Sequence, residues 1–563
     1  MSFIFSTRHL IFDRKAAIAV VLLLVVMTSI AVLPFFVIGE DQKVGCCGGE
    51  MPVTHDSWMH YNQMNAFWRS LTSGIVYPRW DEHTHGYGAP TTSFYPPGIY
   101  YLTAAVHIFA RDWKLTWAGF YWLTMLASAA AIFVYARQWL SRGASIVAAA
   151  IYVFAPYHLL NQYQRGAMSE FTSFIWIPLC LLFADKLLND KAGQSGRLSC
   201  LVGLAASFGA FLWTHPPTAY QFLLVFGCCY AVLIVKAGKW RESLWLTAAL
   251  VFGSMLAAAY FYPAIAEQAL INSDDVERTW PYHASYVFDY SQKVYDRIGN
   301  PFFVRLDRIW VFNLALILIC FAVVLKLNKH ARLNQQIWIW ISAGLLASFL
   351  MTKFSEPIGR LIPKIEIGVY AWRMLTLISF AMAILVGAIA NRSRFLTIAA
   401  LFGVLAMSGW YVAYPMWRGQ SFEPNYEHYN YSTLPRGASR ENPPMPPVQL
   451  ATGKGSISIE RWTPEFRQLR AKLNEADQLQ FRTRNFAGWT ATVNGQVVAI
   501  REGSVNNILF DLPAGDHLIV LEFRSTPIRR AGNWITAISF ALLFSIIIKA
   551  GRPGFRVIAD KEG

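Results

Sequence analysis

Long uninterrupted apolar runs constrain this chain more than any other feature of its sequence. The first run, Ala16–Ile38, contains no charged residue, and similar runs recur as far as 532–548 near the C-terminus. A helix of about 20 apolar residues can cross a hydrocarbon core about 30 Å thick. Charged residues make up only 15% of the 563 residues, against roughly 25% in soluble domains. We therefore predict an α-helical polytopic membrane protein.

The first run resembles a signal peptide only in its flanks. Arg8, Arg14 and Lys15 precede it. Its apolar core is longer than the roughly 7–15 residues of a signal peptide, and no A-x-A cleavage site follows. We expect an uncleaved span with a cytoplasmic N-terminus.

The segment Phe94–Ala110 decides the orientation of every later run. It is apolar but only about 17 residues long, the lower limit for a span, and Pro96-Pro97 stand near its start. If it does not cross, the basic clusters between later runs all fall in cytoplasmic links and the C-terminal tail; if it crosses, they all face outward. The positive-inside rule therefore favours about 12 spans plus one interfacial or re-entrant segment, with both termini in the cytoplasm.

The same rule explains the formal net charge of +15. The basic residues stand in short clusters between apolar runs, so we expect the lipid bilayer and no nucleic acid as their partner. After the first run, the expected spans are 113–136, 144–160, 170–188, 198–214, 218–235, 243–262, 308–325, 334–352, 371–390, 395–414 and 532–548.

The stretch after residue 415 differs in composition from the apolar runs. It opens with the Pro-rich ENPPMPPVQL (441–450) and continues in short alternating runs, with Asn494-Gly495 as a hairpin turn. We expect a small β-sandwich outside the membrane. The predicted domains are a transmembrane domain (1–415) with outer loops 39–112 and 263–307, an extracytoplasmic β-rich domain with its linker (416–530), and a final span with a cytoplasmic tail (531–563).

The opening loop is dense in Asp, His, Arg, Trp and Tyr from Thr54 to Pro97. At helical spacing, Asp56, His60 and Gln63 share one face, and Trp58, Tyr61, Asn65 and Trp68 share the opposite, mostly aromatic face. Such a helix suits the membrane boundary and presents an acid and an imidazole toward the protein. The alternative is that Asp56 is only an N-cap.

Further along the loop, Arg79 stands in YPRW, and His83 and His85 surround a turn in DEHTH. Gly86 and Gly88 allow close backbone approach. A ligand or metal site and a solvated loop are both consistent with this pattern.

Four ionisable residues stand at the expected outer ends of spans. Arg165 and Glu170 lie in YQRGAMSE, where a buried Arg165 needs an anion, either Glu170 or a lipid phosphate. Arg373, in VYAWRML, is a functional candidate, although snorkelling also explains it. His215, before Pro216-Pro217, is read as part of a helix break.

The cysteines carry little information. Cys46 and Cys47 are adjacent in GCCGG, so they could bridge each other only with strain. A zinc site with His55, His83 or His85 is conceivable, but the spacing matches no standard site. The role of this pair is left open.

Several motifs are absent. The chain has no Walker motif, no GxGxxG after a strand and no HExxH, which disfavours a nucleotide-driven pump. Ionisable residues are nearly missing from mid-span positions, which disfavours a proton-coupled transporter.

The layout resembles the membrane glycosyltransferases of the C-type (GT-C) fold, which take sugars from polyprenyl-phosphate donors. Asp56 matches their acidic residue in the first outer loop, and Phe94–Ala110 matches their short outer-leaflet segment. The chain is also similar to a family of large bacterial membrane proteins named for a relation to 6-pyruvoyl-tetrahydropterin synthase. The shared segments are YPRW (77–80), GYG-P (86–90), FYPP (94–97), RGA-x-x-E (165–170), Trp-Arg after Ala371 where an aromatic or Pro is usual, and GW-x-A-x-V-N-G (488–495). The synthase itself binds zinc through clustered histidines, and this chain has no comparable set.

The resemblance implies roles for individual residues. Asp56 would be the general base or a ligand of a divalent cation (Mg²⁺ or Mn²⁺), and Arg165 and Arg373 would steady the leaving phosphate. No second acidic motif follows the third span, and Glu170 is the nearest substitute. The expected substrate-binding residues are His60, Arg79, His83, His85, Tyr95, Arg165, Glu170 and Arg373.

We therefore expect an enzyme that transfers a sugar, with inversion, from a polyprenyl-phosphate-linked donor to an envelope glycan or lipid acceptor on the extracytoplasmic face. A non-catalytic flippase or channel for lipid-linked sugars is the chief alternative, and a structural envelope protein is a third.

Overall fold

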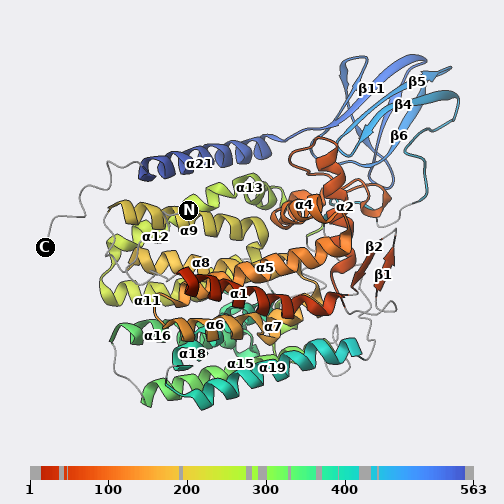
Figure 1. The fold of residues 1–563 in the computed structure, drawn as a ribbon. Coiled ribbons are helices and arrows are strands. Elements are labelled where there is room, and N and C mark those ends of the chain that lie inside the picture. Colours follow the sequence, from red (N-terminus) through yellow and green to blue (C-terminus); the bar gives the residue numbers. More distant parts are fainter. Residues whose placement is uncertain are drawn as a thin grey trace.

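The fold is a bundle of long, roughly parallel helices with a β domain at one end (Figure 1). The computed structural model describes residues 14–36, 43–46, 49–52, 54–188, 194–273, 282–289, 301–326, 331–362, 370–390, 392–417, 433–439 and 443–551. Parts of the two later predicted outer segments, namely 274–281, 290–300, 418–432 and 440–442, lie outside these residues.

The helices of the bundle reproduce the predicted spans. They are α1 (Arg14–Val32), α5 (Trp113–Ala136), α6 (Arg142–Val153), α7 (Pro156–Leu160) with the π-helical turn η4 (Asn161–Arg165), α8 (Met168–Leu188), α9 (Gln194–Thr214), α10 (Pro216–Phe222), η5 (Leu223–Gly227) and α11 (Cys228–Ala237), α12 (Trp240–Leu256), α13 (Ala258–Ala266), α15 (Pro301–Lys326), α16 (Ala331–Leu350), α17 (Glu356–Gly359), α18 (Met374–Ala390), α19 (Arg394–Trp417) and α21 (Pro527–Gly551).

Within the described residues, 10 helices are long and apolar enough to cross a membrane. The number rises to 12 if α12 with α13, bent by 82°, and α16 with α17, bent by 92°, each count as one span. The prediction of about 12 spans is confirmed in this sense.

The segment Phe94–Ala110 forms a short helix rather than a span. It folds as α4 (Gly98–Ala110), whose 13 residues rise about 20 Å, less than the roughly 30 Å of a hydrocarbon core. The chain turns sharply after it, because Arg111 is left-handed (φ 53°) and the Asp112 carboxylate accepts the Leu115 N–H at 2.8 Å. This agrees with the prediction of one apolar segment that does not cross.

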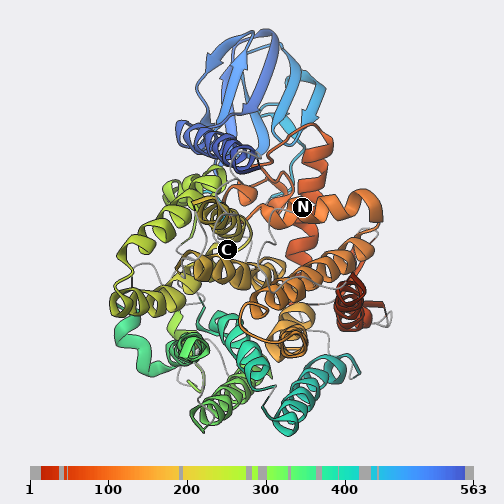
Figure 2. The same ribbon diagram turned by 60° about the vertical axis from the view of Figure 1, so that its left-hand side comes forward.

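At the right-hand end of the bundle in Figure 1 lie α2 (Ser57–Thr72), the hairpin of β1 (Lys43–Cys46) and β2 (Gly49–Pro52), and the β domain. We call this the β-domain end. Helix α21 runs from the β domain along the bundle toward the left of the picture. Figure 2 shows the β domain standing beyond the helices from a second direction.

The β domain is a sandwich of two antiparallel sheets. One sheet has the order β3-β6-β10-β9 and the other β4-β5-β11-β7-β8. The strands are β3 (Val448–Leu450), β4 (Gly455–Thr463), β5 (Phe466–Leu473), β6 (Asp477–Arg484), β7 (Trp489–Val493), β8 (Gln496–Val498), β9 (Arg501–Glu502), β10 (Asn507–Leu512) and β11 (Gly515–Phe523). Asn494 and Gly495 both have positive φ (52° and 82°) between β7 and β8, as a two-residue hairpin turn requires. The predicted sandwich and hairpin are therefore present.

The opening loop is part of the β domain's core. The Trp80 indole lies 5.3 Å, between ring centroids, from both Trp489 and Phe523. Gly88, with φ of +78°, packs on Trp80, because a Cβ there would lie 2.6 Å from the indole Nε1. One carboxylate oxygen of Glu465 accepts the backbone N–H groups of Arg79 (2.6 Å) and Trp80 (3.2 Å). The loop and the β domain therefore hold each other in place.

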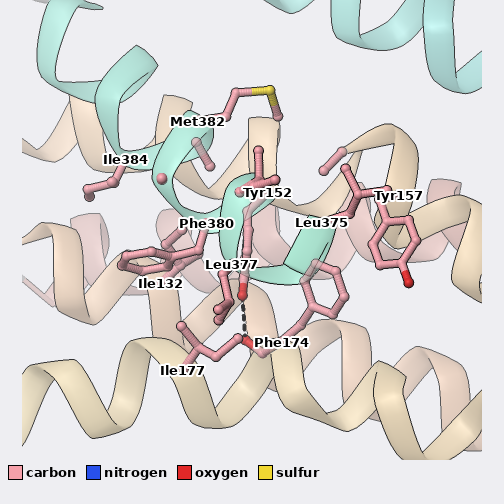
Figure 3. Close-up of a cluster of buried hydrophobic side chains, with 14 of the residues drawn as sticks. Ile132, Tyr152, Tyr157, Phe174, Ile177, Leu375, Leu377, Phe380, Met382 and Ile384 are labelled. Carbon is pink, nitrogen blue, oxygen red and sulfur yellow. Dashed lines mark hydrogen bonds between the residues drawn. The ribbon is translucent and has the colours of Figure 1, made fainter. Parts of the chain in front are cut away.

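Helix α18 lies at the centre of the bundle, where every one of its residues from Met374 to Ile389 is buried. A helix that is apolar on all sides must be surrounded by protein. Figure 3 shows Phe380 and Leu377 among side chains of α5, α6 and α8, with the Tyr152 hydroxyl donating to the Phe174 carbonyl at 3.0 Å. Because α18 packs on α8, the residue that precedes it, Arg373, is brought to the start of α8.

We expect Gly253→Ala to lower the stability of the bundle by roughly 1–3 kcal/mol. Helices α9 and α12 approach closely here, since a Cβ at Gly253 would lie 2.7 Å from the Ala205 carbonyl oxygen. The measurement is Tm in detergent. Gly227→Ala is the matched control, because a Cβ there meets nothing within 4 Å. Equal Tm values for the two variants would contradict this packing.

Candidate functional site

The backbone of the opening loop is fixed to the end of η4. His55 N–H donates to the Gln164 carbonyl at 3.0 Å, and Asp56 N–H to the Arg165 carbonyl at 2.9 Å. Gly166 has φ of +63°, and a Cβ there would lie 2.1 Å from the Thr54 hydroxyl. Only glycine fits this approach, which explains the glycine of the RGA segment and places Asp56 beside Arg165.

Two arginines from different helices share one buried glutamate. Arg165 Nη1 lies 2.5 Å from Glu170 Oε2, and Arg373 Nε lies 3.1 Å from the same oxygen. Arg165 is 4% exposed and Glu170 is 1% exposed. The predicted Arg165–Glu170 pairing is therefore present, and Arg373 joins it across 203 residues of sequence.

The other oxygen of Glu170 is also occupied. Glu170 Oε1 accepts from the Tyr157 hydroxyl at 2.5 Å and from the Thr376 hydroxyl at 3.4 Å. Arg165 Nη1 also donates to Asn161 Oδ1 at 2.9 Å. A carboxylate held by four donors is fixed in its ionised form. Because it neutralises only one of two arginines, the cluster retains one positive charge.

Asp56 lies beside this cluster with no bonding partner of its own. It occupies the N-cap position of α2 but makes no side-chain capping bond. It is 8% exposed, and in the described part of the chain its carboxylate has no hydrogen bond or ion pair. Burial raises the pKa of Asp56 to about 6, an effect that Arg165 and Arg373 oppose. The Asp56 side chain therefore does not cap α2, which was the alternative considered from the sequence.

Tyr95 and His60 complete this side of the site. Burial raises the pKa of the Tyr95 hydroxyl, which lies close enough to Asp56, Arg373 and Arg165 to be affected by their charges. His60 is fully buried, with its ring 5.8 Å from that of Tyr95 and its Nδ1 3.2 Å from the Tyr100 hydroxyl. Burial, together with the charge of Arg165, lowers the pKa of His60 to about 3, so the ring is neutral at pH 7.

The predicted helix faces of α2 are only partly right. His60 and Gln63 are buried, as expected for the face toward the protein. Tyr61, expected on the aromatic boundary face, is buried instead, and its ring lies 6.1 Å from that of Trp113. Trp58 and Trp68 remain partly exposed. The helix is covered on more sides than a boundary helix would be, because α4 and α5 pack over it.

The sequence analysis missed His215 as a site residue. It caps α10 with its ring, accepting the Thr218 N–H on Nδ1 at 3.3 Å, so that a neutral ring carries its proton on Nε2. Burial keeps its pKa well below the usual value, and Arg373, Glu170 and Arg165 are close enough to contribute. His215 therefore adds a neutral N–H donor beside the charge cluster. The sequence could have indicated this role, because His215 is expected at the same end of the bundle as Arg165 and Arg373.

Three predicted site residues lie elsewhere. Arg79 donates from Nη2 to the Ala259 carbonyl (3.1 Å) and to Asn533 Oδ1 (2.9 Å), so it joins the loop to α13 and α21. The His83 side chain is 54% exposed and lies near Arg69 and Glu82. His85 lies close to Arg484 of the β domain. Their contacts are with α13 and α21, with α2 and with the β domain respectively, and none of these contacts involves Asp56.

The described residues do not assemble a metal centre. They contain no group of three or more His, Cys, Asp or Glu side chains arranged to hold a metal ion. Glu170 is already held by four donors, which leaves Asp56 as the free carboxylate of the cluster. Cys47, one of the pair considered for zinc, lies outside the described residues.

These observations define a polytopic membrane protein with a buried charge cluster at its β-domain end. Residues 92–416, more than half of the chain, match the model of the 6-pyruvoyl-tetrahydropterin synthase related domain, described as a membrane protein. The chain belongs to this family, as its motifs predicted. No curated protein sequence matches it.

Two solved structures show similar folds at low identity. The Archaeoglobus fulgidus oligosaccharyltransferase AglB, in complex with an inhibitory peptide and a dolichol-phosphate, is 13% identical with a TM-score of 0.46, covering 76% of this chain and 57% of that one. ArnT from Cupriavidus metallidurans, bound to undecaprenyl phosphate, is 12% identical with a TM-score of 0.32, covering 69% and 78%. The chain thus spans little more than half the length of the oligosaccharyltransferase. These likenesses are too weak to assign an activity.

Glu170→Gln should destabilise the protein by about 3–5 kcal/mol, because it leaves two buried guanidinium groups without their shared anion. Glu356→Gln is the matched control, since the Glu356–Arg360 pair (2.6 Å) is exposed and such pairs contribute about 0–1 kcal/mol. Tm in detergent measures both. A Glu170→Gln variant as stable as Glu356→Gln would mean that the cluster is hydrated and not buried.

Proposed function

We propose that this protein is an integral membrane glycosyltransferase of the C-type. It moves a sugar from a polyprenyl-phosphate-linked donor to an envelope glycan or lipid acceptor. The observation that carries the proposal is the unpartnered carboxyl group of Asp56 beside two arginines that share a single glutamate.

Asp56 has the properties of a general base. A catalytic base works best when its pKa is near the operating pH, and burial raises the pKa of Asp56 to about 6. With no other bond to break, its carboxylate can accept the proton of an acceptor hydroxyl. The acceptor oxygen then bonds to the sugar's anomeric carbon, while the bond from that carbon to the phosphate oxygen breaks. Attack on the face opposite the leaving phosphate inverts the configuration.

The arginines suit the leaving group. Arg165 and Arg373 carry one positive charge more than Glu170 neutralises, in a setting with little water. Fixed positive charge in such a setting stabilises the negative charge that develops on a departing lipid phosphate. The neutral Nε2–H of His215 can donate a hydrogen bond to the same group. Tyr95 and His60 line the side toward Asp56, where the sugar and the acceptor would bind.

A divalent cation, Mg²⁺ or Mn²⁺, remains a prediction with Asp56 as its ligand. Such a cation would have to complete its shell with water, substrate oxygens or residues outside the described ranges, because Glu170 is occupied. The two arginines already provide the positive charge that the departing phosphate needs.

The proposed location is the extracytoplasmic face of a bacterial inner membrane. The β-domain end carries the loop, Asp56 and the charge cluster together. Basic residues such as Lys186, Lys236 and Arg392 lie in the described chain near the opposite ends of their helices, where the positive-inside rule expects the cytoplasm. On this topology both termini are cytoplasmic and the β domain orients the acceptor.

A flippase or channel for lipid-linked sugars is the second candidate, since the same arginines would bind the same lipid phosphate. The two proposals differ at Asp56. A flippase needs no base, so it would tolerate an amide there.

Asp56→Asn should lower sugar transfer by about 10²–10⁴-fold, the usual contribution of a general base. The assay uses the membrane fraction and the polyprenyl-phosphate lipid that co-purifies with the protein, identified by mass spectrometry. Lipid binding should be retained, and Tm at pH 7 should be unchanged or higher, because Asp56 has no partner to lose and the amide removes a buried charge. Asp112→Asn, at the exposed N-cap of α5, is the control. Unchanged transfer by Asp56→Asn, with lipid translocation intact, would favour the flippase.

The pH dependence provides an independent check on the same group. Transfer at low substrate concentration should rise between pH 5 and 7 with an apparent pKa of about 6, as Asp56 ionises. Stability should change in the opposite sense. The folded pKa lies above the unfolded value of 3.8, so the stabilising contribution is complete below pH 4 and is lost as the pH rises through 6, by roughly 3 kcal/mol in all. Asp56→Asn should abolish both trends, and a profile that survives the substitution would assign the base elsewhere.

A further inference from the structure

A buried cation in the β domain occupies a position where its strand should carry an apolar side chain. In β5 the buried, inward-facing positions are Arg467, Leu469, Ala471 and Leu473. Three of them fill the core between the sheets. Arg467, at the end of the row nearest the opening loop, is only 2% exposed.

The Arg467 guanidinium makes cation–π contacts with two indoles. Its central carbon lies 4.6 Å from the centroid of the Trp462 ring and 4.4 Å from that of Trp489. Trp462 stands directly opposite Arg467 in the β4–β5 register and is half-buried. Cation–π contacts of this kind hold the guanidinium in one plane.

The guanidinium has no acceptor in the described part of the chain. Arg467 Nε and Nη1 are buried there without a hydrogen-bond partner, and no carboxylate lies within ion-pair distance. Burial lowers the pKa of Arg467 to about 9, so the group is still charged at pH 7. A buried charge without an anion is costly to keep.

The neighbouring polar groups are donors as well. The indole Nε1 atoms of Trp489 and Trp80 are buried without a partner among the described residues, and their rings lie 5.3 Å apart. The acid whose charge affects Arg467 is Glu82 of the opening loop. Its carboxylate lies 3.5 Å from the His83 ring instead. The seam between the loop and the β domain therefore contains several buried N–H donors that have no acceptor among the described residues.

We propose that the Trp462–Arg467–Trp489 group binds the carboxylate of an acidic saccharide, such as a uronic acid unit. A guanidinium N–H forms a charge-assisted hydrogen bond with a carboxylate. An indole offers a wide apolar face to the C–H groups of a pyranose ring, and Trp462, the more exposed of the two, is the face that a sugar would reach first. The choice of a saccharide rests on the proposed function; the choice of a carboxylate rests on the donors.

The experiment measures binding to the full-length protein in nanodiscs by tryptophan fluorescence, since two indoles line the site. The probes are tetragalacturonate and the neutral tetrasaccharide of galactose. Wild type should bind the acidic probe at least tenfold more tightly than the neutral one. Arg467→Met should remove this preference and should raise Tm or leave it unchanged, because it replaces an unpaired buried charge by an apolar chain of similar length.

Two further variants keep the test decisive. Arg470→Met, on the exposed face of the same strand and paired with Glu460 at 2.6 Å, should leave affinity unchanged. Trp462→Leu keeps the charge but removes one aromatic face, and should weaken binding severalfold even if Arg467→Met fails to fold.

The proposal fails if wild type binds the two tetrasaccharides equally, or if Arg467→Met changes Tm without changing affinity, which would leave Arg467 a purely structural residue. It also fails if inorganic phosphate displaces the fluorescent response as readily as galacturonate does. None of these measurements depends on sugar transfer. A protein that binds tetragalacturonate but shows no transferase activity would therefore reject the proposed function and retain this site.

Discussion

The structure depends on one buried carboxylate shared by two guanidinium groups. Glu170, at the start of α8, holds Arg165 from the end of η4 and Arg373 from the turn before α18. Such charges are stable in a low-dielectric interior only when their geometry is satisfied on all sides. The pairing therefore fixes the relative positions of three helix ends that the apolar packing of the bundle, which is non-directional, could not fix alone.

Backbone contacts with the residues of this cluster fix the position of Asp56. The loop is bonded to Gln164 and Arg165 at one end, and Trp80 is inserted into the β domain at the other. Helix α21, which directly follows the β domain, is joined to the end of α13 by the buried Arg529–Glu267 pair, 2.8 Å apart. The loop that carries Asp56 is thus held by contacts with both the bundle and the β domain. These contacts bury the Asp56 carboxyl group, and its burial raises its pKa, without any bond to the side chain itself.

Much of this architecture could be predicted because its signals are local. The spans follow from run length, and their orientation from where lysine and arginine stand. The Asn494-Gly495 hairpin follows from turn chemistry, and the Arg165–Glu170 pair from a spacing of five residues. The grouping of Asp56 with Arg165 and Arg373 at one end of the bundle also agrees with the topology derived from charge.

The rest could not be read from the sequence because it depends on partners far away in the chain. Arg79, His83 and His85 stand in a polar loop, as binding residues often do. Arg79 instead meets Ala259 and Asn533, 180 and 454 residues away. Nothing in YPRW indicates that its tryptophan completes the core of a sandwich that begins nearly 370 residues later. In the same way, the proline pair after His215 hid a ring whose neighbours come from α8 and the turn before α18.

The three charged residues of the cluster have buried partners, whereas the buried Asp56 and Arg467 have none among the described residues, and this difference bears on their roles. Arg165, Glu170 and Arg373 are paired, so their presence is explained by the structure they hold together. Asp56 and Arg467 are buried without a partner in the described chain, and each makes the folded state less stable than a neutral residue of the same shape would. A structural role accounts for the first group but not for the second. An unpaired carboxyl group that can take a proton and an unpaired guanidinium among N–H donors are each completed by something that the protein binds.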